Sequence, residues 1–121
     1  MAKILVVDDE EHIRMLYDEE LKEEGYEVIT SATGRNIVEL IEKERPDLII
    51  LDIKMTDCNG LDVLQQIRNK YYNLPVILST AYETYKSDIK SMAADAYVVK
   101  SFDLTELKNK IKQSLEARAA K

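Results

Sequence analysis

The chain is poor in several residue types, and each shortage excludes a class of protein. Among its 121 residues it has one cysteine, Cys58, so no internal disulfide can form. It has two prolines and three glycines, and no stretch reads as a flexible linker or a low-complexity segment. No uninterrupted apolar run exceeds four residues, so we expect no membrane insertion. The start of the chain also lacks the apolar core of a signal peptide, and we therefore expect a cytoplasmic protein.

Positive charge is also scarce. Seventeen Lys and Arg residues face 23 Asp and Glu residues, which gives a formal net charge of −6. The diffuse basic field that drives binding to nucleic acids is missing, so direct nucleic-acid partners are not expected. Hydrophobic residues make up 45% of the chain, which is enough for one ordinary core. We expect a single domain over residues 1–121.

Short aliphatic runs alternate with segments of helical spacing. The runs are Ile4 to Val7, Val28-Ile29, Leu48 to Leu51, Val76 to Leu78 and Ala96 to Val99. Their nearly continuous apolar character is typical of strands that are buried on both faces. The apolar faces of the expected helices are Ile13, Leu16, Tyr17 and Leu21; Ile37, Leu40 and Ile41; Leu61, Leu64 and Ile67; Tyr85, Ile89 and Met92; and Leu104, Leu107, Ile111 and Leu115. The pattern is a strand followed by a helix, five times.

Alternation of this kind predicts an α/β fold with a doubly wound, five-stranded parallel sheet. The common solution for five strands is the flavodoxin-like order 2-1-3-4-5, in which the winding reverses between the first and third strands. Ligands of such sheets bind outside the carboxyl ends of the strands, at this reversal.

Acidic residues follow the two strands at this reversal. Asp8 and Asp9 come directly after the first run, and Asp52 comes directly after the third. Like charges at such short range raise one another's pKa, and a divalent cation with oxygen ligands relieves the repulsion. Thr80 ends a further strand region and Lys100 follows the last one, which adds a hydroxyl and a positive charge. Together these groups suit a metal-bound phosphoryl group.

With these residues in view, the chain resembles the receiver domain of two-component response regulators, and in particular the single-domain chemotaxis regulators. The resemblance runs from about Lys3 to Leu115. It is carried by Asp8 and Asp9 in Val-Val-Asp-Asp-Glu, Asp52 in Leu-Asp-Ile-Lys-Met, Thr80 in Ser-Thr-Ala and Lys100 in Val-Val-Lys. Each motif alone is weak, but all of them in order, each at the end of its own strand, are a specific signal.

The resemblance implies a role for each of these residues. Asp52 would accept a phosphoryl group from a phosphohistidine. Mg²⁺ would be held by Asp8, Asp9, Asp52 and the backbone carbonyl of Lys54. Lys100 and Thr80 would contact the phosphoryl oxygens, and Thr80 would act with Tyr97 as a switch.

The family also implies the partners. A histidine kinase or a histidine phosphotransfer domain would supply the phosphoryl group. The switched surface, formed by the fourth helix, fifth strand and fifth helix, would bind a downstream protein that the sequence does not identify.

Two positions depart from the family pattern. Thr56 stands where the family commonly has proline four residues after the acceptor, which removes a constraint on the loop. Ser101 stands where proline usually follows the lysine, often after a cis bond. A cis bond before a residue other than proline costs about 3–4 kcal/mol, which favours a trans bond between Lys100 and Ser101.

Three other functions compete with this interpretation. Phosphatases of the haloacid-dehalogenase class also use an aspartate after a strand, but they usually carry a second acid where this chain has Lys54. A nucleotide or flavin carrier would need a glycine-rich phosphate loop after the first strand, where this chain has acids. A receiver that acts only as an unphosphorylated scaffold is disfavoured, because all the required side chains are present. The sequence therefore favours a phosphoacceptor module over a turnover enzyme.

Overall fold

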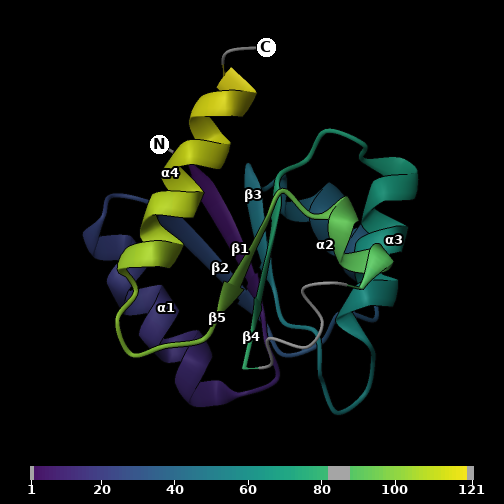
Figure 1. Ribbon diagram of the computed structural model, residues 1–121, viewed down its shortest axis with the longest axis horizontal. Coiled ribbons are helices and arrows are strands. Elements are labelled where there is room, and N and C mark those ends of the chain that lie inside the picture. The colour runs from purple at the N-terminus through teal and green to yellow at the C-terminus, as the bar shows by residue number, and fades with distance from the viewer. Residues whose placement is uncertain (1, 82–87, 120–121) are drawn as a thin grey trace.

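A five-stranded parallel sheet forms the centre of the computed structural model, which describes residues 2–81 and 88–119 (Figure 1). Its order is β2-β1-β3-β4-β5. The strands are β1 (Lys3–Val7), β2 (Glu27–Ser31), β3 (Leu48–Leu51), β4 (Val76–Thr80) and β5 (Ala96–Val99). This order is the predicted one, so the expected α/β fold class is confirmed. The winding reverses between β1 and β3, which are neighbours in the sheet.

Helices cover both faces of the sheet (Figure 1). Helices α1 (Glu11–Glu23) and α4 (Thr105–Ala119) lie on one face, and α2 (Ile37–Glu44) and α3 (Gly60–Lys70) lie on the other. The sheet separates two hydrophobic clusters. Ile4 and Val6 of β1 pack with α1 and α4, while Leu5 and Val7 of the same strand pack with α2 and α3. Because successive residues of a strand face opposite sides, both faces need apolar side chains, which explains the continuous aliphatic runs.

The ends of the helices follow local sequence signals. Gly25, just after α1, has a φ of 95°, a left-handed conformation that glycine adopts at no steric cost. Helix α2 ends at Glu44, and its C-cap residue Arg45, which precedes a proline, is left-handed with a φ of 53°. At the start of α3 the side chain of Asn59 accepts a hydrogen bond from the Leu61 N–H, at 2.8 Å. These ends set the directions in which the connecting loops leave the helices.

The fourth helical segment differs from the prediction. Tyr85 lies outside the described residues, and Ile89–Ala93 form a short 3₁₀ helix, η2. Met92, which was expected on a packed face, is 72% exposed. A 3₁₀ helix has three residues per turn, so the i, i+3, i+4 pattern that predicted a buried α-helical stripe does not apply to this turn.

Helix α4 is fastened at both ends. The Lys108 Nζ lies 3.0 Å from Glu20 Oε1 of α1, and Arg118 donates from Nη1 to the backbone carbonyl of Asp47 at 2.7 Å.

The described residues contain no helix that is long and apolar enough to cross a membrane.

Candidate functional site

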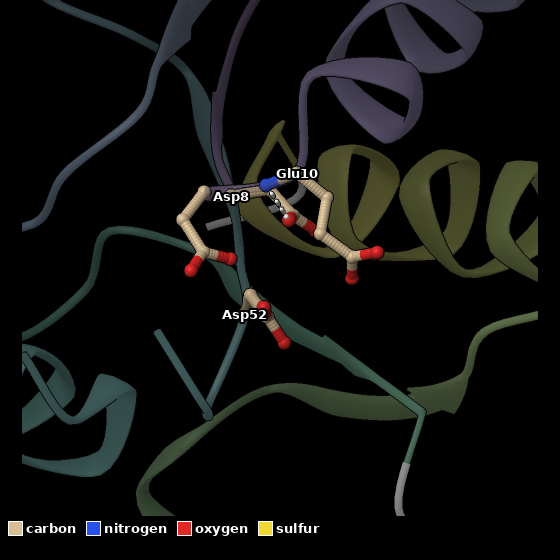
Figure 2. Close-up of side chains that lie close together, drawn as sticks. Asp8, Glu10 and Asp52 are labelled. Carbon is tan, nitrogen blue, oxygen red and sulfur yellow. Dashed lines mark hydrogen bonds between the residues drawn. The ribbon is translucent and has the colours of Figure 1, made fainter. Parts of the chain in front are cut away.

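Two neighbouring strands deliver the acidic residues to one edge of the sheet. Asp8 follows β1 and Asp52 follows β3, and the Asp52 N–H donates to the Val7 carbonyl at 2.9 Å. This hydrogen bond continues the pairing of the two strands, so the two aspartates stand side by side. Both are almost completely buried, at 2% and 3% exposure. Figure 2 shows their side chains beside that of Glu10. The convergence predicted for Asp8 and Asp52 is therefore present.

Lys100 brings a positive charge into this group. It follows β5, and its N–H donates to the Thr80 carbonyl at 2.7 Å, which ties it to the end of β4. Its Nζ lies 2.8 Å from Asp8 Oδ2 and 3.4 Å from Asp52 Oδ2. The ammonium thus lies between the two buried carboxylates and contacts both of them.

These contacts shift the pKa values of the site in opposite directions. Burial, together with the charge of Asp8, raises the pKa of Asp52 from 3.8 to about 6, although Lys100 acts against this shift. Burial by itself would lower the pKa of Lys100, but its hydrogen bond to Asp8 and the charges of Asp52 and Asp8 raise that pKa above its usual value. At neutral pH the lysine is charged and Asp52 is mostly ionised. The site therefore holds an ionised carboxylate beside a fixed cation.

The side chain of Asp9 is held by Thr56, in the loop between β3 and α3. Its Oδ2 accepts hydrogen bonds from both the N–H and the hydroxyl of Thr56, at 2.8 and 2.7 Å. The hydroxyl bond is the largest contribution to lowering the pKa of Asp9. The exchange of proline for threonine at this position removes one backbone constraint, but the structure replaces it with two hydrogen bonds.

Glu10 belongs to the same cluster, although no sequence motif assigned it a role. Its Oε1 lies 3.1 Å from Lys100 Nζ, and its N–H donates to Asp8 Oδ1 at 2.9 Å, as the dashed line in Figure 2 marks. Consecutive acids at the start of a helix are common, because the helix dipole favours them, so nothing in the sequence distinguished this glutamate from its neighbour Glu11. The contact with Lys100, which lies 90 residues away, is what singles it out.

The acidic cluster suits a hard divalent cation. One carboxylate oxygen from each of Asp8, Asp9, Glu10 and Asp52 lies within 4.8 Å of the others. Oxygen ligands of this kind are those that Mg²⁺ prefers, and it needs only one or two carboxylates because it keeps several waters. Four carboxylates around one ammonium also leave an excess of negative charge. The residues present therefore fit the magnesium site expected from the sequence.

The remaining predicted residues lie around this cluster. Thr80 is fully buried at the end of β4, and Tyr97 is half-buried on β5, packed against the hydrophobic cluster that β1 and β3 share with α2 and α3. Lys54 is exposed in the loop after Asp52 and pairs with Asn59 in an isolated antiparallel bridge. The described residues contain no cis peptide bond, so the bond between Lys100 and Ser101 is trans, as expected.

Comparisons with known proteins agree with this geometry. Residues 4–112 match the family model described as the response regulator receiver domain. The chain is 34% identical over 119 residues to the sporulation initiation phosphotransferase F of Bacillus subtilis, which covers 97% of this chain and 96% of that protein.

Solved structures are also similar. The response regulator TrrA of Thermotoga maritima, in complex with Mg²⁺ and BeF, is 50% identical, with a TM-score of 0.91 over 94% of this chain and 99% of that one. TrrA in complex with the histidine kinase ThkA gives a TM-score of 0.89 at 50% identity, over 95% of this chain and 99% of that one. A receiver domain protein of Methanospirillum hungatei, described as similar to CheY, is 31% identical with a TM-score of 0.92, over 99% and 98% of the two chains.

Proposed function

The chain belongs to the family of response regulator receiver domains, and from this membership we propose that Asp52 accepts a phosphoryl group from a phosphohistidine. The whole chain, residues 1–121, would then act as one phosphoacceptor module. One observation carries this assignment. Asp52 is a buried carboxylate at the carboxyl end of β3, within 3.4 Å of Lys100 Nζ and inside the acidic cluster.

In the proposed transfer, an oxygen of Asp52 forms a bond to phosphorus as the bond from phosphorus to the histidine nitrogen breaks. The transition state of such transfers is loose and spreads its charge over the phosphoryl oxygens, so positioning and electrostatics supply most of the catalysis. Lys100 already lies beside Asp52 and provides a positive charge for those oxygens. Thr80, at the end of the adjacent strand, would donate its hydroxyl to one of them.

We propose that Asp8, Asp9, Asp52 and the backbone carbonyl of Lys54 hold Mg²⁺ at this site. When bound, Mg²⁺ neutralises the repulsion between the acids and the incoming phosphoryl oxygens. The similarity to TrrA, which was solved with Mg²⁺ and BeF, supports this proposal, as does the close approach of the carboxylates here. Glu10 would add a further negative charge and a competing partner for Lys100.

Phosphorylation would act as a switch through Thr80 and Tyr97. The new anionic group would draw the Thr80 hydroxyl toward it, and the space left behind would favour an inward position of Tyr97. Such a change shifts the balance between two existing arrangements and alters the surface formed by the fourth helical segment, η2, the fifth strand, β5, and the fifth helical segment, α4. This surface would bind the downstream protein partner.

The proposed donor is a histidine kinase or a histidine phosphotransfer domain. TrrA was solved together with the histidine kinase ThkA, which supports a donor of this class. We expect docking near α1 and the loop after Lys100, where Phe102 is fully exposed and Met15 is 63% exposed. The proposed setting is the cytoplasm, and neither nucleic acid nor membrane is among the proposed direct partners.

A phosphoacceptor is favoured over a phosphatase of the haloacid-dehalogenase class. Such phosphatases usually carry an acid two residues after the nucleophile, which protonates the leaving group, and that residue here is the exposed Lys54. We therefore propose a signalling module that is phosphorylated once at Asp52 and does not turn over phosphomonoesters.

Phosphorylation by a small donor tests this proposal. The protein is incubated with acetyl phosphate, with and without MgCl₂, and its intact mass is measured. We expect one added phosphoryl group that requires Mg²⁺ and is absent from Asp52→Asn. The matched control is Asp18→Asn, which changes an aspartate of α1 that pairs with Lys22 and should leave phosphorylation intact. Steady release of product from a phosphomonoester, or full phosphorylation of Asp52→Asn, would refute the assignment.

A further inference from the structure

Thr56 makes a contact that neither the phosphoacceptor chemistry nor the family motifs account for. It lies in the loop between β3 and α3, four residues after Asp52, and it reaches Asp9 at the end of β1. Both of its donors, the backbone N–H and the side-chain hydroxyl, go to the same carboxylate oxygen, Oδ2 of Asp9. Two donors on one oxygen restrict the rotation of the Asp9 side chain.

The loop that carries Thr56 is itself held in place. Asp57 of this loop accepts a hydrogen bond from the Thr33 hydroxyl at 2.7 Å and forms an ion pair with Arg35 at 3.4 Å; both partners lie in the segment after β2. Where the two ends of the loop meet, the Gly60 N–H at the start of α3 donates to the Ile53 carbonyl at 2.6 Å. The loop is thus tied to the segment after β2, to the start of α3 and, through Thr56, to Asp9. Thr56 therefore presents its donors from a constrained loop.

We propose that Thr56 is a positioning residue that orients Asp9 as a ligand for the divalent cation. This inference rests on the proposed function, because it takes the acidic cluster as the cation site. Asp9 is partly exposed and stands at the start of a loop, whereas the strand-end carboxylates of Asp8 and Asp52 are buried and need less support. Outer partners that orient a metal ligand strengthen binding because less motion is lost when the ion arrives.

Magnesium affinity measured by titration calorimetry tests the inference without relying on phosphorylation. Thr56→Val removes the hydroxyl and keeps the shape and the N–H. Because Thr56 is exposed, this change should leave the fold intact. We expect Thr56→Val to bind Mg²⁺ about fivefold more weakly, the effect of one hydrogen bond. Thr56→Ser keeps the hydroxyl and should bind within about twofold of the original protein.

Thr105 provides a matched control. Its N–H and hydroxyl both donate to Asp103 Oδ1, the same arrangement at a carboxylate outside the acidic cluster. Thr105→Val should therefore leave magnesium affinity unchanged, even if it lowers stability. Unchanged affinity in Thr56→Val, or an equal loss in Thr105→Val, would overturn the role of Thr56.

The two proposals fail in different ways. Asp9→Asn, measured in the same titration, reports whether Asp9 is a ligand at all. If it weakens Mg²⁺ binding while Thr56→Val does not, the cation site and the proposed function stand and the role of Thr56 falls. If the unchanged protein takes up no Mg²⁺ and no phosphoryl group, the proposed function fails and the inference falls with it.

Discussion

Asp52 combines two properties that oppose each other, burial and ionisation. It is 3% exposed and stands beside another buried carboxylate, Asp8, so its pKa rises to about 6 even with Lys100 in contact. The proposed role requires Asp52 to be ionised, and here ionisation costs stability. A buried acid that carries such a cost is more often found at a functional site than at a structural one.

This cost gives a pH-dependent prediction for Asp52→Asn. The folded-state pKa of Asp52 lies above its unfolded value of 3.8, so the folded protein holds a proton that the unfolded chain releases. Stability from this group is therefore lost as the pH rises from about 4 to about 6, and the penalty is complete above that range. Removing the charge should raise the free energy of unfolding at pH 7.5 by about 2–3 kcal/mol in the absence of divalent cations, and by almost nothing below pH 4.

Urea unfolding in EDTA at pH 7.5, 5 and 4 measures this difference. The control is Asp18→Asn, a change at a partly exposed ion pair on α1 that should alter stability by less than about 0.5 kcal/mol at each pH. An Asp52→Asn protein that is less stable than the original at pH 7.5 would contradict the electrostatic account of the site.

At the scale of elements, the start of α3 packs directly against the end of β3. A Cβ on Gly60, the first residue of α3, would lie 2.0 Å from the Asp52 carbonyl oxygen and 2.7 Å from the Ile53 Cα. Both of these atoms belong to the backbone, so neither can rotate away. The glycine is therefore needed for the start of α3 to pack this closely against the backbone of Asp52 and Ile53.

Gly60→Ala should consequently disturb both stability and phosphorylation. We expect a loss of at least about 2 kcal/mol in the free energy of unfolding and slower phosphorylation by acetyl phosphate, because Asp52 must shift. The control is Gly25→Ala. A Cβ added at Gly25 would have no other atom within 4 Å, but the backbone there is left-handed. This substitution should cost about 1 kcal/mol and leave phosphorylation unchanged. Equal effects of the two substitutions in urea unfolding and phosphorylation would mean that the close approach at Gly60 is unimportant.

At the scale of the whole molecule, folding gathers acidic groups that are far apart in the unfolded chain, so the proposed cation site exists only in the folded state. Asp8, Asp9 and Asp52 come from segments 43 or more residues apart, and folding of β1 beside β3 is what brings their charges together. A cation that binds this cluster stabilises the folded state by mass action.

Magnesium should accordingly raise the temperature of unfolding. At a Mg²⁺ concentration ten times its dissociation constant, the gain is about 1.4 kcal/mol, which corresponds to a few degrees. The gain should shrink at pH 5, because Asp52 is then mostly protonated and must release its proton to bind the ion. Thermal unfolding in MgCl₂, compared with NaCl at equal ionic strength, measures the shift. A shift that persists in Asp9→Asn would point to binding elsewhere.

Much of this molecule could be predicted from its sequence. The five aliphatic runs and the helical spacing between them predicted the sheet order, and the positions of Asp8, Asp52 and Lys100 after their strands predicted that they meet. These predictions succeeded because burial on both faces leaves a one-dimensional pattern, and because parallel strands end at a common edge. The roles of these residues in phosphoryl transfer stay predictions.

Other features depended on contacts that no sequence pattern records. The 3₁₀ turn that exposes Met92, the pairing of Glu10 with Lys100 and the hydrogen bonds from Thr56 to Asp9 became visible only in three dimensions. Sequence by itself determined that the strands are buried and at which edge the charged groups gather, because continuous apolar runs mark buried strands and parallel strands end at a common edge. Tertiary structure alone decided the partner of each polar side chain, because the loops that hold those partners are placed by packing between distant elements.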